Sequence, residues 1–142
     1  MVLQLQICKL PTLTAFRVPM VGTPVRAGYP SPADDFLEDF IDLNKELVKN
    51  KATTFYARVV GNSMETDFSE GDVLVVDRSL PLQNKKIAVC FVDGSFTVKK
   101  VRLEGNALYL EALNTAFEPI RITEDNQFLI WGIVTYVVKR VW

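Results

Sequence analysis

The chain has 142 residues, of which 49% are apolar and 23% charged, so it can bury one sizeable core, and one folded domain plus an arm is expected. Its 16 basic and 17 acidic side chains give a net charge of -1, which predicts neither direct DNA binding nor attraction to acidic membranes. The start of the chain lacks a signal-like core, no apolar run reaches the length of a membrane span, and the only cysteines, Cys8 and Cys90, suit reduced thiols, so a cytoplasmic protein is expected.

Residues 1–30 are predicted to form an extended arm. They lack sustained hydrophobic periodicity and contain four prolines: Pro11, Pro19, Pro24 and Pro30. Proline blocks helix continuation and favours extended geometry in the residue before it, so this segment can lie across a surface as a substrate strand would. It supplies none of the helices of a helix-turn-helix. Residues 31–142 are predicted to form the folded domain.

A helix is predicted to follow the arm. Ser31 and Pro32 suit its N-cap and its first helical position. Apolar residues then recur at steps of four, three and four, as on one helical face: Phe36, Phe40, Leu43 and Leu47. Asp42 could break this helix by capping a second, short one. We expect the apolar face to pack on the sheet or on a partner subunit.

From Phe55 onward the pattern predicts strands and turns, and hence a mainly β, strongly curved sheet. The strands are expected at residues 55–60, 73–77, 86–92, 96–103, 107–111, 119–122 and 128–138. Asp93-Gly94 is a strong hairpin signal between two of them. The last run, FLIWGIVTYVVKRVW, is predicted to be core or dimer interface. No metal-ligand spacing or phosphate-binding glycine loop is present, so neither a metal nor a cofactor is expected.

Ser63 is the candidate nucleophile. It lies in a turn between the first two of these strands, where Gly61 permits unusual backbone angles and Asn62 is a small polar neighbour. The alternative is a polar loop with an incidental serine, so a base has to be found. Because the chain contains no histidine, the base cannot be that of a serine, histidine and aspartate triad.

Lysine is the remaining candidate for the base. A lysine that is neutral near pH 7 needs a pKa more than about 3 units below its usual value of roughly 10.4, which desolvation in an apolar strand can provide. In DGSFTVKKVRL, residues 93–103, strand alternation places Thr97, Lys99 and Val101 on one face and Lys100 on the other. Lys99 is therefore predicted to be the more buried lysine. The alternative is an edge strand protected by lysines.

Together these segments resemble the LexA and UmuD family of self-cleaving serine and lysine proteases. The matching motifs are GNSM at 61–64, EGDVLVVD at 70–77 and FTVKK at 96–100, and PVRAGYPSPADD at 24–35 resembles the family's cleavage segment. The resemblance is closest to UmuD, because YPSPADDF and IDLNKELV also match where the two subfamilies differ. It implies a curved β domain of the LexA and UmuD C-terminal type, with an extended N-terminal arm and one or two short helices.

The resemblance also implies a role for several residues of this chain. They are Ser63 as nucleophile, Lys99 as base, Thr97 as the hydroxyl that orients the lysine, the backbone amides of Asn62 and Ser63 as oxyanion donors, and Ala27 and Gly28 as the two sides of the cleaved bond.

The function implied is that of a self-cleaving mutagenesis protein of the SOS response to DNA damage. Such proteins cleave faster on a RecA filament on single-stranded DNA. The truncated homodimer then joins a UmuC-like polymerase for error-prone synthesis past lesions. Two alternatives stay open: a non-enzymatic polymerase adaptor, in which the serine and the lysine persist only as structure, and a fragment of a LexA-like repressor.

Overall fold

The computed structural model describes residues 4–9, 18–21, 37–60, 68–112 and 118–142, with side chains from residue 41 onward. The chain divides into two compact units. One comprises Met1–Pro11 and Asn50–Trp142, and the other comprises Thr12–Lys49.

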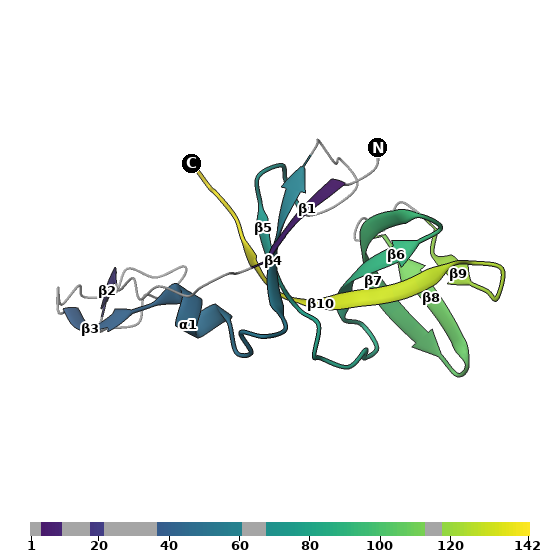
Figure 1. Cartoon of the computed structure of the whole chain (residues 1–142), viewed down its shortest axis with the longest axis horizontal. Coiled ribbons are helices and arrows are strands. Elements are labelled where there is room, and N and C mark those ends of the chain that lie inside the picture. The colour runs from purple at the N-terminus through teal and green to yellow at the C-terminus, as the bar shows by residue number, and fades with distance from the viewer. Residues whose placement is uncertain (1–3, 10–17, 22–36, 61–67, 113–117) are drawn as a thin grey trace, which may run out of the picture. The chain divides into compact units, whose positions relative to one another are not determined.

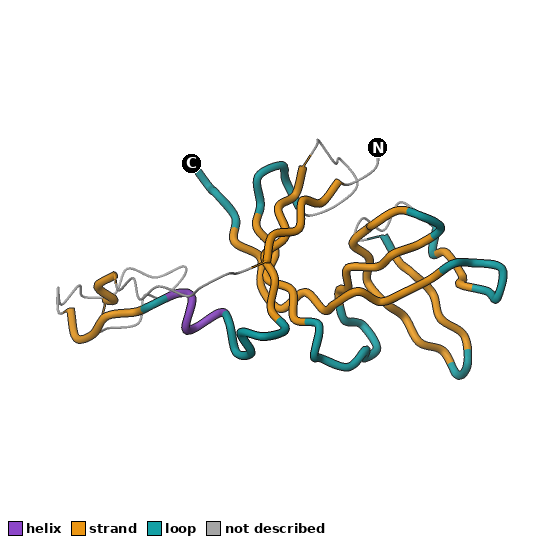
Figure 2. The backbone as a smooth tube through the Cα atoms, viewed as in Figure 1, coloured by secondary structure: helices purple, strands orange, loops and turns teal. Residues whose placement is uncertain are grey.

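The larger unit is one antiparallel sheet of eight strands (Figures 1 and 2). The strand order is β1-β4-β5-β10-β6-β7-β8-β9, so the sheet is open, with β1 and β9 at its edges. Its strands are β1 (Gln4–Lys9), β4 (Thr54–Val60), β5 (Val73–Asp77), β6 (Ile87–Val92), β7 (Ser95–Glu104), β8 (Ala107–Glu111), β9 (Ile120–Ile122) and β10 (Phe128–Val138).

The long strand β10 joins the two halves of this sheet. Residues 128–133 of β10 pair with β6, and residues 133–138 pair with β5, so Ile133 has partners on both sides. In Figure 1, β10 accordingly runs from the group β6 to β9 toward the group β4 and β5. The register shifts twice along β10, between Ile130 and Gly132 and between Val134 and Tyr136, and such bulges bend a strand. The expected curved, mainly β architecture is confirmed.

All seven strands predicted from Phe55 onward are present, each within one residue of its predicted bounds. The turns explain why. Asp93 and Gly94, between β6 and β7, have φ values of 48° and 91°, and two positive φ values in a two-residue loop are those of a type I′ hairpin. Gly105 has a φ of 57° in the two-residue loop between β7 and β8. The local turn chemistry therefore fixed the strand boundaries.

The predicted helix was largely wrong. Leu37–Ile41 is a strand, β3, which pairs with β2 (Val18–Val21) in the smaller unit, while residues 31–36 lie outside the described part. Aspartate, phenylalanine and isoleucine are weak helix formers, so pairing with β2 overrides the helical spacing.

The second, short helix is confirmed: α1 (Leu43–Leu47) is capped by Asp42, whose Oδ1 accepts a hydrogen bond from the Asn44 backbone at 3.1 Å. Leu43 on its predicted apolar face is 58% exposed.

Within the described residues, no helix has the length and apolar character that crossing a membrane would require.

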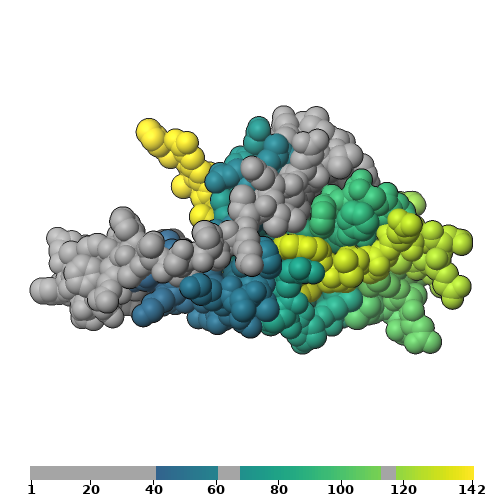
Figure 3. Space-filling view, viewed as in Figure 1, coloured from purple at the N-terminus to yellow at the C-terminus, as the bar shows by residue number. Residues whose placement is uncertain are grey.

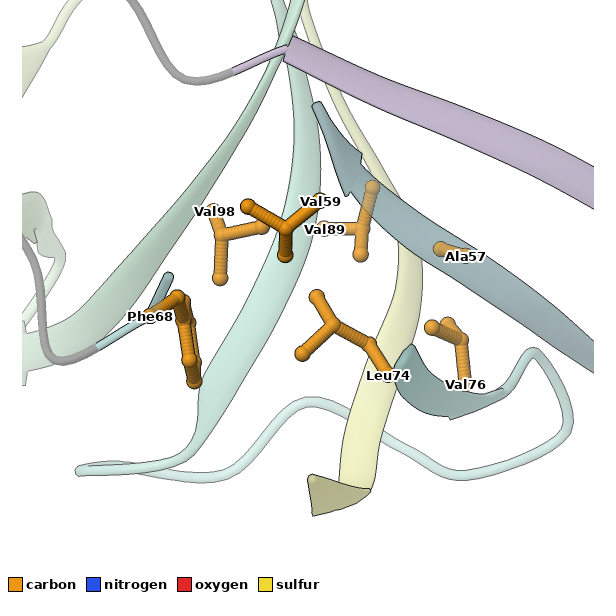
Figure 4. Close-up of a cluster of buried hydrophobic side chains, with 7 residues drawn as sticks. All are labelled: Ala57, Val59, Phe68, Leu74, Val76, Val89 and Val98. Carbon is orange, nitrogen blue, oxygen red and sulfur yellow. The ribbon is translucent and has the colours of Figure 1, made fainter. Parts of the chain in front are cut away.

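Two apolar clusters fill the larger unit. The first cluster contains Ala57, Val59, Phe68, Leu74, Val76, Val89 and Val98 (Figure 4). The second cluster contains Ala88, Cys90, Val101, Leu110 and Ile133. In β6, Val89 is in the first cluster while Ala88 and Cys90 are in the second, because successive side chains of a strand point to opposite faces. In β7, Val98 and Val101 are likewise in different clusters. Both faces of this part of the sheet are therefore covered.

The carboxylate of Asp77 ties the end of β5 to the turns beside it. Its Oδ1 accepts hydrogen bonds from Thr53 Oγ1 at 2.8 Å, Ser79 N at 2.8 Å and Ser79 Oγ at 2.7 Å. Burial opposes ionisation of this group, but the hydrogen bonds outweigh it, and the pKa of Asp77 is lowered from its ordinary value of 3.8. The ionised form therefore stabilises the fold. This contribution is complete above the ordinary pKa and is lost as the pH falls through the lower, folded value.

We expect Asp77→Asn to reduce the free energy of unfolding by about 1 kcal/mol at pH 7, because hydrogen bonds to a charged acceptor become bonds to a neutral one. The difference from the unmodified protein should shrink once the pH falls below the ordinary pKa of 3.8, toward the lowered pKa of the folded state. Urea denaturation at pH 7 and at the lower pH measures it. A difference that grew on acidification would contradict the role given to Asp77.

Candidate functional site

The predicted lysine base lies in an interior strand. Lys99 is in β7, which lies between β6 and β8 in the sheet, so β7 is not the edge strand of the alternative. Its pairing with β8 begins at Lys100, directly after Lys99. The pairing of β6 with β7 is regular: Thr97 lies opposite Cys90, and Lys99 lies opposite Ala88. Thr97 and Lys99 therefore share one face of β7, and Lys100 lies on the other, as the alternation predicted.

Burial does not separate the two lysines. Lys99 and Lys100 are both half-buried. On the face of Lys100, Val98 is 1% exposed, and on the face of Lys99, Val101 is 0% exposed. Strand alternation predicted one covered face, whereas β7 is covered on both. The choice of Lys99 over Lys100 therefore depends on the family motif.

The face that Lys99 shares is apolar. Its neighbours across β6 and along β7 are members of the second cluster, Ala88, Cys90 and Val101. Burial raises the pKa of the Cys90 thiol to about 12, and the positive charge of Lys99 partly opposes this rise. Within the part of the chain that the structure describes, Lys99 forms no hydrogen bond or ion pair. Lys99 thus shares its face of β7 with buried apolar residues, and the Cys90 thiol is protonated and inert.

The predicted nucleophile, the oxyanion residues and the cleaved bond, namely Ser63, Asn62, Ala27 and Gly28, lie outside the described residues. Thr97 and Lys99 are the predicted site residues that the structure brings together.

The two ends of the segment that contains Ser63 are nevertheless fixed. Val59 and Phe68, which flank it, pack in the first cluster together with Val98, the residue between Thr97 and Lys99 (Figure 4). Two backbone hydrogen bonds hold the ends together, from Gly71 N to Val59 O and from Val59 N to Asp72 O, each 2.8 Å long. The chain therefore enters and leaves this segment beside the strand that contains Lys99.

Sequence reasoning missed one charged contact at this place. Lys139 Nζ lies 2.6 Å from Asp72 Oδ2, and Asp72 is almost completely buried. In the sequence, Asp72 stands out only as part of the motif EGDVLVVD at 70–77. The two residues are 67 positions apart, so no local pattern links them. A carboxylate that is buried in a turn beside a core strand needs a positive charge near it. That requirement is the one signal from which a basic partner of Asp72 could have been predicted.

Comparison with known proteins supports the motif match. The family model described as Peptidase S24-like matches residues 19–135. Protein ImpA of Salmonella typhimurium is 37% identical over 123 residues, covering 86% of this chain and 83% of that protein. Protein MucA of Escherichia coli is 36% identical over 121 residues, covering 84% and 82%. The LexA repressor of Colwellia psychrerythraea is 34% identical over 129 residues, covering 89% of this chain and 60% of the repressor.

The matched region begins before the predicted cleavage segment and ends within β10, so it spans every residue assigned to the site. The chain therefore belongs to the Peptidase S24-like family, as its resemblance to the LexA and UmuD proteins predicted.

Proposed function

We propose that this chain is a self-cleaving mutagenesis protein of the SOS response, which cuts itself between Ala27 and Gly28. The observation that supports this best is the family match over residues 19–135, because it contains the cleavage segment, the candidate nucleophile and the candidate base in one alignment. The relatives ImpA and MucA match over most of both chains, which favours a UmuD-like protein over a fragment of a longer repressor.

The proposed reaction is an acyl transfer to serine. Ser63 Oγ gives its proton to the neutral amine of Lys99 and attacks the carbonyl carbon of Ala27. The backbone amides of Asn62 and Ser63 stabilise the oxyanion, and one such donor typically contributes about 3 kcal/mol to the transition state. Lys99 then donates the proton to the leaving amine of Gly28, and water hydrolyses the ester. Thr97 orients the lysine from the same face of β7.

The anchoring of the segment around Ser63 is compatible with this chemistry. Ser63 is three residues beyond Val60, the end of β4, and three residues reach at most about 11 Å. Phe68, the first described residue after the segment, belongs to the same apolar cluster as Val98 of β7. Both described ends of the segment therefore lie beside the strand that contains Lys99, as the proposed reaction requires.

Gly28→Lys is expected to block processing by at least about a hundredfold while the protein stays folded, because a long side chain beside the cleaved carbonyl displaces it from the attacking oxygen. Gel analysis of timed incubations measures the rate, and circular dichroism checks the fold. Asn106→Lys is a matched control, since it adds the same side chain in an exposed hairpin turn far along the chain from the cleavage segment, at a residue without a positive φ. Cleavage of folded Gly28→Lys at the unmodified rate would move the cut to another bond.

The proposed partners are a RecA filament on single-stranded DNA, which accelerates the cut, and a UmuC-like polymerase, which binds the truncated product in the cytoplasm. The test adds RecA, single-stranded DNA and nucleotide to the protein and then asks whether product or intact chain co-purifies with the polymerase. Faster cleavage and retention of the product support the proposal. Polymerase binding without any product would instead indicate a non-enzymatic adaptor.

We also propose a homodimer, formed through the end of β10. Residues 134–138 of β10 pair with β5 on one side, and no described strand pairs with their other side. The apolar side chains there are exposed, and Val141 and Trp142 beyond them are 94% and 96% exposed. The end of the chain, yellow in Figure 3, is uncovered in that view. An unpaired apolar strand edge favours pairing with another chain, and a second copy offers the same edge.

The dimer is expected before and after cleavage. Sedimentation at micromolar concentration should give about twice the chain mass in both forms. Replacement of Val137 by lysine should shift the protein toward monomer, because it puts a charge on the apolar edge. A monomer of the unmodified protein in both forms would contradict the proposal.

A further inference from the structure

The carboxylate of Asp72 is a buried charge at the base of the segment that contains Ser63. Asp72 is 3% exposed. Its Oδ2 accepts a hydrogen bond from Ser69 N at 2.9 Å, and its backbone N–H donates to Ser69 O at 3.0 Å. These bonds close residues 69–72 into a turn directly after Phe68. Two backbone hydrogen bonds, from Gly71 N to Val59 O and from Val59 N to Asp72 O, attach this turn to β4.

The counter-charge comes from the far end of the chain. Lys139 follows the last residue of β10, and its Nζ lies 2.6 Å from Asp72 Oδ2 and 3.3 Å from Ser69 Oγ. The side chain of Lys139 is 39% exposed, so its ammonium stays partly hydrated while it neutralises a carboxylate that water hardly reaches. Because an ionised carboxylate is costly to bury without a counter-charge, the buried Asp72 carboxylate needs the Lys139 ammonium to remain in place.

We propose that Lys139 and Asp72 are a positioning pair for the nucleophile: together they fix the turn from which the segment of Ser63 is suspended. This inference rests on the proposed function. Without the ammonium, the carboxylate has to hydrate, and the turn at residues 69–72 must open to admit water. Phe68 would then shift in the first cluster. Displacement of a reacting group by about 1 Å can reduce a rate a hundredfold, so a contact outside the reacting atoms can control self-cleavage.

The test compares Lys139→Met, Lys139→Arg and Asp72→Asn in the full chain. The rate of self-cleavage without activator at pH 9 is measured together with amide hydrogen exchange of the peptides around residues 59–72 and 87–103. Arg140→Met is the matched control, because it removes a neighbouring positive charge whose described contact is with the ring of Trp142. Circular dichroism limits the comparison to folded protein.

We expect Lys139→Met to cleave at least tenfold more slowly than the unmodified protein and to exchange faster around residues 59–72, with no change at 87–103. Lys139→Arg should restore both properties, and Arg140→Met should alter neither. The double variant of Asp72→Asn with Lys139→Met should be no slower than the slower single variant, because the two residues act as one unit.

Two results would overturn the pair: unchanged cleavage in folded Lys139→Met, whatever its exchange, or losses in Arg140→Met equal to those in Lys139→Met. If the unmodified protein does not cleave itself at all, the proposed function fails. The exchange of residues 59–72 then decides by itself whether Lys139 fixes this turn. The two failures are therefore distinguishable.

Discussion

Lys99→Ala is expected to abolish self-cleavage at every pH, as is Ser63→Ala, whereas Lys100→Ala should cleave with a nearly unchanged pH profile. Only a neutral amine can accept the serine proton, and the chain has no histidine to replace it. In the unmodified protein without activator, the rate should rise about tenfold per pH unit until the lysine is fully deprotonated, and then level off. Gel densitometry of incubations between pH 6 and pH 10 measures all four profiles.

Lys100→Ala is a demanding control because the structure makes the two lysines alike in burial. Lys100 is adjacent, carries the same charge and is half-buried, but it lies on the opposite face of β7. If folded Lys99→Ala still cleaves at pH 10 while Lys100→Ala does not, the base is Lys100. A flat rate between pH 6 and pH 10 in the unmodified protein would remove lysine as the base altogether.

Gly132→Ala is expected to lower the free energy of unfolding by about 1–3 kcal/mol, and Gly132→Val by more. A Cβ at Gly132 would lie 2.6 Å from Val76 Cγ1 and 3.2 Å from Arg78 Cγ, well inside the normal carbon contact of about 3.5–4 Å. Val76 is fully buried, and its branched side chain has little rotamer freedom with which to yield. Replacing a glycine usually stabilises a protein by about 0.4–1 kcal/mol, because it lowers the conformational entropy of the unfolded chain. We expect this clash to outweigh that gain.

Leu129→Ala is the matched control for Gly132, since it lies in the same strand but is more than half exposed. Urea denaturation should find it within about 0.5 kcal/mol of the unmodified protein. Gly132→Ala at or above the unmodified stability would mean that β10 does not approach β5 as closely as described. Arg78 also contacts β10 at this bulge. Its Nε donates a hydrogen bond to Trp131 O at 2.9 Å, and its guanidinium lies 4.7 Å from the centre of the Trp131 ring.

The strands were predictable because their signals are local. Alternating apolar residues and turns such as Asp93-Gly94 specify where each strand begins and ends, and each turn adopts the backbone angles that its residues favour. The failed helix shows the limit of this reasoning. Phe40 and Leu43 are spaced for one helical face, but β3 finds a partner in β2, and pairing between distant segments is not encoded in spacing.

The candidate site was predictable only in part. The order of the serine, lysine and cleavage motifs identified the family, and alternation assigned Thr97 and Lys99 to one face. Alternation could not foresee that β7 is covered on both faces, because that depends on how the sheet curves around β10. Nor could it reveal the contact of Lys139 with Asp72, which exists only once the end of β10 lies beside the turn after Gly71.

Self-cleavage between Ala27 and Gly28 is tested most directly by the intact mass of the protein after incubation, alone at alkaline pH and with RecA, single-stranded DNA and nucleotide at neutral pH. We expect a fragment of residues 28–142, which has 115 residues, together with the released residues 1–27. The fragment should form faster in the presence of the filament. An undivided chain under both conditions, or fragments that end at another bond, would contradict the assignment of this protein as a peptidase that acts on its own arm.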